Sequence, residues 1–248
     1  MMTYDGFDFS RYMIVNDIGR PLMPPQVIQS MEITGRHGAY FLEKRHAPIV
    51  LPVEVTLHED LNMSYMEMKR YIAGNLNKKE PKKLIFEDEP DMSIHAIITD
   101  NTEIDDLLKA GTTTLHFYCP DPFYYAIEDE VFTFNGEGSY DFTRAKGNEE
   151  SEPLIEIQGM NSGGVITLKT DHSEINFEGA LNSGETLVFD SHFMTAYVLQ
   201  VDGTKRSANN DIDSLDFPIL AVGANNVTVS TENASVSTIR IYARSRWI

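Results

Sequence analysis

The sequence predicts a mainly β protein, in which an α+β N-terminal domain with one helix precedes a C-terminal β-sandwich. Short runs of alternating apolar and polar residues recur along the chain, whereas one segment alone has the spacing of an amphipathic helix. The composition changes around residues 126–152, and the chain then becomes uniformly β with frequent turns. We therefore predict a domain boundary near residue 130, with domains at 1–130 and 131–248.

The N-terminal domain is predicted to contain a β-barrel or sheet. Val27–Thr34 is predicted to be a strand, and Gly35–Gly38 a tight turn, because glycine readily adopts the positive φ that such turns need. In Ala47–His58 the apolar residues alternate with polar ones, which predicts a half-buried strand.

The single predicted helix runs from about Ser64 to Leu76. Either Asn62 or Ser64 can cap its start, and Asn75–Lys79 can end it. Four apolar residues would form one stripe along it: Tyr65, Met68, Ile72 and Leu76.

Three further strands are predicted at Lys82–Phe86, Ser93–Thr99 and Thr112–Cys119, and Asn101–Ala110 is predicted to be a loop or one helical turn. Cys119 is the single cysteine of the chain, so an intramolecular disulfide is excluded. Because it ends an apolar run, we expect a buried and inert thiol.

The C-terminal domain should contain about seven short strands, which is typical of a β-sandwich. They are predicted at Leu154–Gln158, Val165–Thr170, Glu174–Phe177, Thr186–Asp190, Ala196–Val201, Val227–Thr231 and Ser237–Ala243.

The chain carries a formal net charge of −18. This charge argues against binding to nucleic acid or to anionic membranes, both of which attract clustered Lys and Arg. Met1–Ser10 lacks the basic and apolar regions of a signal peptide, and no apolar run approaches the roughly 20 residues that span a bilayer. We therefore expect a soluble protein made in a cytoplasm, with no membrane partner.

No catalytic, cofactor-binding or metal-binding residues are predicted, and no cofactor. The chain contains no GxSxG, P-loop or GxGxxG motif, and its seven histidines are scattered. Asn209–Asp216 has an Asp-x-Asp pattern, but Ser214 and Leu220 stand where a calcium loop needs Gly and Glu, which favours an ordinary surface loop. We expect that the protein is not an enzyme.

The C-terminal residues form a basic and aromatic pattern. If the last strand continues to the C-terminus, four side chains share one face: Arg240, Tyr242, Arg244 and Arg246. Arginine and tyrosine are common at interfaces, so this face could meet carboxylates of a neighbouring subunit. Partners within the chain, or solvent, are the alternative.

Five segments in one order carry a resemblance to a known family: Gly35–Gly38, Leu51–Val55, the helix at 64–76, Pro81–Pro90 and Phe117–Tyr124. Together they resemble the distal tail proteins (Dit) of siphophages and prophages of Gram-positive bacteria. The resemblance covers essentially the first 130 residues, and the rest matches mainly in architecture. His37 departs from the pattern, because an acidic residue is common there.

The resemblance implies a structural virion component at the tail tip. In this family the N-terminal domain forms a hexameric hub ring, and a galectin-like sandwich lies outside it. The ring joins the major tail tube protein to the tail-associated lysin or tip protein, in the baseplate or receptor-binding apparatus, and its periphery can carry a receptor-binding protein. The negative charge would let DNA pass through without specific binding, or would simply give solubility.

We expect Val27–Thr34, Ala47–His58 and the helix to build the ring, and Gly35–Arg45 to form an arm that laps a neighbour. The alternative function is a carbohydrate-binding adhesion module that acts through the sandwich. No galectin sugar-binding motif is visible, and the single Trp is Trp247. A hydrolase of cell-wall glycans is the third possibility, and it would need two facing carboxylates in a cleft.

Overall fold

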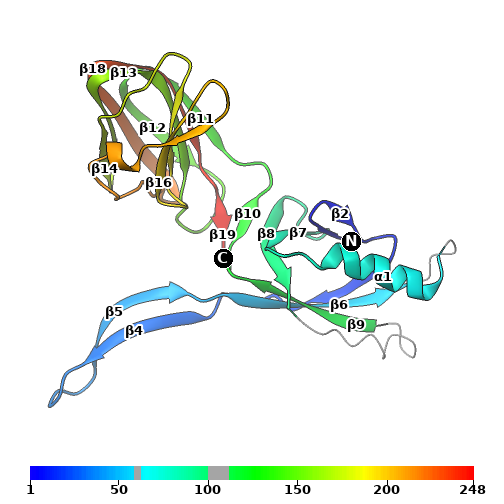
Figure 1. Cartoon of the computed structure of the whole chain (residues 1–248). Helices are drawn as coiled ribbons and strands as arrows, with labels where there is room; N and C mark the ends of the chain where they lie inside the picture. The colour runs from blue at the N-terminus through cyan, green and yellow to red at the C-terminus, as the bar shows by residue number, and fades with distance from the viewer. Residues whose placement is uncertain (59–62, 100–111) are drawn as a thin grey trace. The chain divides into compact units, whose positions relative to one another are not determined.

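A computed structural model describes residues 1–58, 63–99 and 112–248. The chain divides into two compact units, Met1–Ile127 with Ile248, and Glu128–Trp247 (Figure 1). Both units are built almost entirely of antiparallel strands, and the first contains a helix, so the mainly β fold class is confirmed. Whether each unit folds by itself stays a prediction. Among the described residues, no helix has the length and apolar character needed to cross a membrane.

The first unit is organised around one antiparallel sheet. Its strands are β1 (Met2–Tyr4), β2 (Phe7–Asp8), β3 (Met13–Ile18), β6 (Ile49–Leu57), β7 (Lys82–Phe86), β8 (Met92–Ile98), β9 (Thr112–Cys119) and β10 (Tyr124–Ala126). The order across the sheet is β2-β1-β7-β8-β9-β6-β3, and β10 pairs with β8. The predicted strands β6 to β9 are confirmed, and Val53 and Val55 of β6 are fully buried as their alternation requires.

Strands β1, β2 and β3 lie ahead of Val27, where the sequence analysis predicts none. β1 and β2 have three and two residues, which is too short for a repeating pattern. β3 contains a bulge between Val15 and Asp17, so its core-facing residues do not keep a period of two.

Helix α1 runs over Tyr65–Leu76, as predicted. Ser64 forms a capping box with Glu67, in which each side chain accepts from the other residue's backbone N–H. Three of the four predicted stripe residues are buried, Met68, Ile72 and Leu76. Asn62 and the Asn101–Ala110 segment lie outside the described residues.

The apolar face of α1 and the inner face of the sheet form one core. Tyr4 packs edge-on against Phe117, with ring centroids 5.4 Å apart, and its hydroxyl donates to the carbonyl of Ala96. Cys119 is fully buried, and burial raises the pKa of its thiol to about 12. The prediction that the cysteine is buried is confirmed, and its inertness stays a prediction that the raised pKa supports.

The second unit is a sandwich of strands with a single core. Its elements are β11 (Val131–Asn135), β12 (Gly138–Arg144), β13 (Leu154–Thr170), β14 (Glu174–Phe177), β15 (Thr186–Asp190), β16 (Thr195–Leu199), β17 (Lys205–Ser207), a short 3-10 helix η2 (Asn209–Asp211) and β18 (Gly223–Tyr242). A short strand, β19 (Arg246–Trp247), follows β18 and is not part of the sandwich sheet. β11 and β12 lie in the 126–152 segment, for which no strand is predicted. The other strand regions are confirmed.

Two long strands replace two predicted pairs of short ones. The interval between Leu154–Gln158 and Val165–Thr170 is not a turn but a pair of irregularities within β13, at Gln158/Gly159 and Asn161/Val165. A Cβ on Gly159 would lie 2.1 Å from the carbonyl oxygen of Ser235 in β18, so only glycine allows this approach. The glycine-rich sequence therefore indicates close contact between strands.

The long strands contribute to both layers of the sandwich. The first part of β13 pairs with β15, and the last part pairs with β14. Likewise, β18 pairs first with β12 and then with β11, while the two long strands pair with each other along their length. The layers thus share two strands, and fully buried residues such as Ile157, Leu168 and Phe189 fill the core between them.

Hydrogen bonds join the first residues of the second unit to its last residues. The carboxylate of Asp129 accepts the backbone N–H of Arg244 at 2.7 Å and that of Ser245 at 3.2 Å. The carboxylate of Glu130 accepts from the hydroxyl of Ser245 and from two backbone N–H groups at Ala145 and Lys146. Burial opposes ionisation of Glu130, but these donors hold its pKa below the ordinary value. The unit therefore begins and ends at one place.

Candidate assembly surface

Residues 26–46 form a hairpin, which we call the arm. It consists of β4 (Gln26–Glu32) and β5 (Ala39–His46), which pair only with each other among the described strands. Gly35 and Gly38 have φ of +84° and +82°, so the predicted tight turn is confirmed. In Figure 1 the arm (light blue) extends away from the other strands of the first unit.

The arm exposes apolar side chains that its own chain does not cover. Every residue from 27 to 45 is exposed, and Phe41 and Ile28 keep 65% and 62% of their surface accessible. The other large exposed apolar residues are Val27, Met31, Ile33, Tyr40 and Leu42. A lone two-stranded hairpin is marginally stable in water, and an apolar patch of this kind marks a contact surface. The arm is thus the strongest candidate for assembly.

The strand register assigns these side chains to two faces. Ile28 lies opposite Lys44, and Ser30 lies opposite Phe41, so one face carries the two most exposed apolar residues and a cation. We call it the Phe41 face. The opposite face carries Val27, Met31, Tyr40 and Arg45. A bulge at Leu42 separates the paired positions on β5.

The root of the arm is fixed to the first unit. The Gln26 amide nitrogen donates to the carbonyl of Pro24 and lies 3.0 Å from Nδ1 of His46. The ring of His46 contacts Phe123 edge-on, with centroids 5.5 Å apart. β5 also runs almost directly into β6 of the main sheet. These contacts set the direction of the arm.

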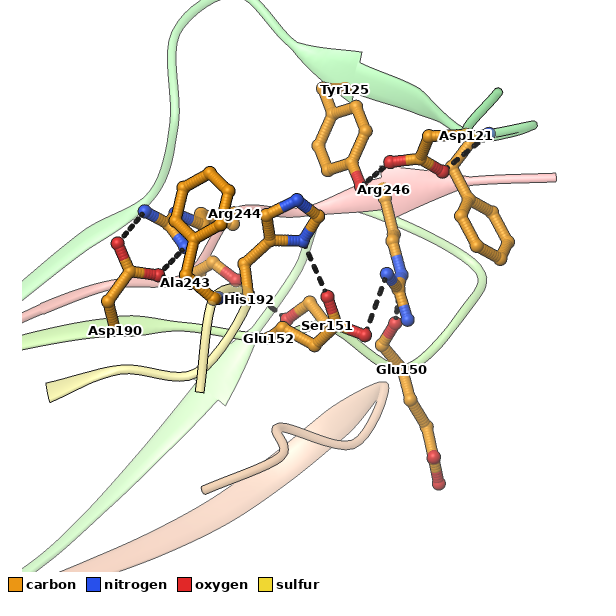
Figure 2. A network of polar contacts seen from close by, with 12 residues as sticks. Asp121, Tyr125, Glu150, Ser151, Glu152, Asp190, His192, Ala243, Arg244 and Arg246 are labelled. Carbon is orange, nitrogen blue, oxygen red and sulfur yellow. Dashed lines mark hydrogen bonds and ion pairs between the residues drawn. The ribbon is translucent and has the colours of Figure 1, made fainter. Parts of the chain in front are cut away.

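The second unit contains a network of buried and half-buried charges (Figure 2). Arg244 binds Asp190 through two hydrogen bonds, of 2.6 and 3.1 Å. Burial opposes ionisation of Asp190, but the hydrogen bonds and charge of Arg244 hold the pKa of Asp190 below its ordinary value. The pair joins the end of β15 to the C-terminal segment.

Glu152 is the second centre of this network. Its carboxylate lies 2.7 Å from Nδ1 of His192 and 3.3 Å from a guanidinium nitrogen of Arg246. The hydrogen bond from His192, together with the Arg246 charge, keeps the pKa of Glu152 below its ordinary value despite burial. The hydroxyl of Ser151 donates to the carbonyl of Ala243 and not to His192. The cluster therefore has the geometry of a structural clamp rather than of a nucleophile and its base.

The structure corrects the prediction for the C-terminal arginines. β18 ends at Tyr242, and Arg244 has a φ of +49°, so the alternation breaks before Arg244 and Arg246. Both arginines bind carboxylates of their own unit. The hypothesis that they share a strand face aimed at a neighbouring subunit is therefore wrong. A residue with positive φ other than glycine leaves no reliable signal in the sequence.

The acidic loop around Asn209–Asp216 uses its carboxylates within the fold. Asp211 forms an ion pair with Arg206 at 3.1 Å, and Asp213 accepts the backbone and side-chain N–H groups of Asn176, both at 2.8 Å. Within the parts of the chain that the structure describes, no three His, Cys, Asp or Glu side chains gather as a metal site would need.

A comparison with protein-family models gives one match, which extends over residues 7–119 and is described as the phage tail protein RIFT-related domain. Most of the first unit therefore resembles a phage tail protein domain. The arm, β3 and α1 all lie within the matched range, so we refer to residues 7–119 as the tail domain.

Comparison with solved structures extends the likeness from the tail domain to the whole chain. The SPP1 Dit protein, described as a paradigm of the hub adsorption apparatus in phages that infect Gram-positive bacteria, matches with a TM-score of 0.73. The match covers 100% of this chain and 98% of that one at 17% identity, so the two share a fold. A chain of the phage p2 baseplate in its activated conformation with strontium also matches, with a TM-score of 0.47. That match covers 94% of this chain and 91% of the baseplate chain at 10% identity, and no argument rests on it. A search of curated protein sequences gave no match.

Proposed function

We propose that the chain is a distal tail protein, a structural subunit whose hexameric hub ring joins a phage tail tube to the tail tip or baseplate. The fold shared with SPP1 Dit along the entire chain carries the proposal, and the tail domain supports it. A hub acts through geometry, so it needs surfaces that hold copies and partners in place, and no catalytic centre. We therefore propose no enzymatic activity.

The arm supports assembly into a closed ring. A contact between the arm of one copy and a different surface of the next copy is heterologous, and such contacts close into a ring when the rotation between copies permits. The proposed partners are the major tail tube protein and the tail-associated lysin or tip protein, with a receptor-binding protein at the periphery. The net charge of −18 per copy would repel DNA that passes through the channel without binding.

Mass measurement by light scattering, with negative-stain images of the same sample, tests the proposal. A monomer has a mass of 28.0 kDa, so six copies should give about 168 kDa and six-fold rings with a central hole. Replacing two apolar residues of the Phe41 face, Ile28→Ser with Phe41→Ser, should leave monomers of unchanged thermal stability, because these side chains contact solvent in the single chain.

The matched control is Phe193→Ser, which removes a side chain that is 69% exposed in the second unit. This variant should still assemble. A wild-type chain that stays at 28.0 kDa at every concentration, and also when it is mixed with the tail tube protein of the same phage, would contradict the proposal.

The carbohydrate-binding alternative has less support. A hollow of about 330 Å³ on the sandwich is lined by Asp141, Phe142, Thr143, Asp171, Ala224, Asn225 and Asn226. Its single aromatic residue, Phe142, is buried, so the hollow offers no ring on which a sugar could stack.

A further inference from the structure

Helix α1 lies at the surface of the first unit and leaves one side uncovered (Figure 1). Its inner residues Met68, Ile72 and Leu76 pack into the core, whereas Met66 keeps 54% of its surface exposed and Tyr71 keeps 42%. Methionine, tyrosine and arginine are enriched at protein interfaces, and the uncovered side of α1 carries all three types. We call this side the outer face of α1.

Four exposed residues form a row along the outer face: Met66, Arg70, Ala73 and the cap residue Asn77. Their spacing of three or four residues is that of a ridge on a helix, which fits the groove of a second helix. Gly74 lies beside the row, and a Cβ added to it would meet nothing within 4 Å. A glycine inside a helix costs about 0.5–1 kcal/mol relative to alanine, and no contact within the described chain explains this one. The open space would admit the backbone of a neighbouring helix.

Tyr71 is held in place although it is partly exposed. Its ring contacts Phe7 edge-on, with centroids 5.7 Å apart, and the ring of Tyr12 at 5.5 Å. A side chain that is already fixed loses little conformational entropy when a partner binds. Tyr71 is therefore suited to anchor a contact on the outer face.

The segment that contains α1 is strongly cationic. Residues 63–83 contain six cationic and two acidic residues, and the whole chain has 20 and 38. This leaves 14 and 36 elsewhere, so the segment carries a net charge of +4 and the remainder −22. Lys78 and Lys82 form ion pairs within the chain. The side chains of Arg70 and Lys79 are exposed and form no ion pair or hydrogen bond with any described residue, so they favour an acidic partner.

A second copy of this chain does not supply a matching partner. α1 is the single α-helix of the described residues, and two outer faces packed together would bring Arg70 of one copy against the same residue of the other. The phosphates of a nucleic acid would pair with the cations but would leave Met66 and Tyr71 without apolar contacts. The outer face instead fits a helix that carries acidic and apolar side chains at the same spacing.

We propose that the outer face of α1 binds an acidic amphipathic helix of a protein other than this chain. The apolar side chains of that helix pack on Met66 and Tyr71, and its carboxylates pair with Arg70 and Lys79. Gly74 lets the two backbones approach closely. This inference goes beyond the proposed hub function and does not require the ring, so the two can fail separately.

A labelled synthetic peptide of leucine and glutamate, with the leucines in one helical stripe, tests the proposal. Fluorescence anisotropy with the whole chain measures its affinity. A peptide of the same composition with its leucines scrambled keeps the charge but loses the stripe, and it should bind at least about tenfold more weakly. Equal binding of the two peptides would overturn the proposal, and so would equal binding of duplex DNA with the same number of charges.

Charge reversal locates the binding site. Arg70→Glu with Lys79→Glu should weaken binding of the striped peptide at least about tenfold. The matched control is Lys44→Glu with Arg45→Glu, which makes the same change of charge in the arm, where three cationic residues stand against two acidic ones. The control should keep the affinity within about twofold, because these charges lie outside the contact. An equal loss in both variants would mean that the peptide responds to net charge and not to the outer face.

Gly74→Ala separates docking from folding. It should stabilise α1, because alanine is the better helix former, and yet weaken binding of the striped peptide, because the methyl group fills the space that the second backbone needs. Weaker binding by a more stable chain cannot come from misfolding, whereas unchanged binding would overturn the close packing of two helices. Six-fold rings, sought without any peptide, report on the hub function independently.

Discussion

Asp190 shows how a single buried carboxylate supports the second unit. Its side chain is almost inaccessible, and Arg244 and the backbone N–H of Phe193 satisfy its oxygens. The basic pattern at the C-terminus indicates Arg244 as a contact residue but does not indicate its partner, since Asp190 lies more than fifty residues away and is one of many acidic residues. Pairing of this kind depends on the fold and leaves no local pattern.

Asp190→Asn should lower the free energy of unfolding by about 1.5–3 kcal/mol at pH 7, because Arg244 loses a charged hydrogen-bond partner. The folded-state pKa of Asp190 is below its ordinary value, so the stabilisation is complete above about pH 4 and is lost as the pH falls through the folded-state pKa. Urea denaturation across this range should show the difference between wild type and variant shrinking below pH 4.

The control for this measurement is Asp216→Asn, which removes an exposed carboxylate and should change stability by less than about 0.5 kcal/mol. A wild-type-to-variant difference that is independent of pH from 7 down to 2 would show that the ion pair is not the source of the effect.

At the scale of elements, regular patterns were predictable and interrupted ones were not. The alternation in β6 and the stripe and cap of α1 allowed both to be predicted, because each repeats over several turns or pairs. β3 was missed because its bulge breaks the period. The strand Val27–Thr34, the turn Gly35–Gly38 and an arm at Gly35–Arg45 were predicted, but β5 was not predicted as a strand. The exposure of the arm's apolar residues could not be predicted either, since sequence does not tell whether the same chain or another copy covers them.

Two glycine substitutions should change stability in opposite directions. Gly159→Ala should destabilise by about 1–3 kcal/mol, because the added methyl group meets the backbone carbonyl of Ser235 across the long strands. Gly74→Ala in α1 meets nothing within 4 Å and should stabilise by about 0.5–1 kcal/mol, because alanine is the better helix former. Chemical denaturation of both variants measures this, and a harmless Gly159→Ala would mean that β13 and β18 do not approach closely.

At the scale of the whole molecule, the dominant quantity is the net charge of −18. Composition alone gave this value and with it the expectation of weak affinity for nucleic acid. Composition could not show that the arm differs in charge from the rest of the chain, because that difference becomes meaningful only once residues 26–46 are known to stand apart.

Salt should strengthen self-association. Copies with the same large charge repel one another over distances comparable to the Debye length, which shortens from about 10 Å at 0.1 M salt to about 3 Å at 1 M. Light scattering at 0.05 M and 0.5 M sodium chloride should therefore show a higher mass at 0.5 M for equal protein concentration. A lower mass at 0.5 M would mean that ion pairs between copies outweigh the general repulsion.

The ties at Asp129 and Glu130 have a consequence for how such proteins diversify. The chain enters the second unit at Asp129 and Glu130 and leaves it beside them, at Arg244 and Ser245. A unit whose two ends lie together can be deleted, or replaced by another compact domain whose ends also lie together. The first unit, with the arm, would keep its own hydrophobic core through such an exchange. The surface of the first unit could then remain constant in a lineage while the second unit is replaced.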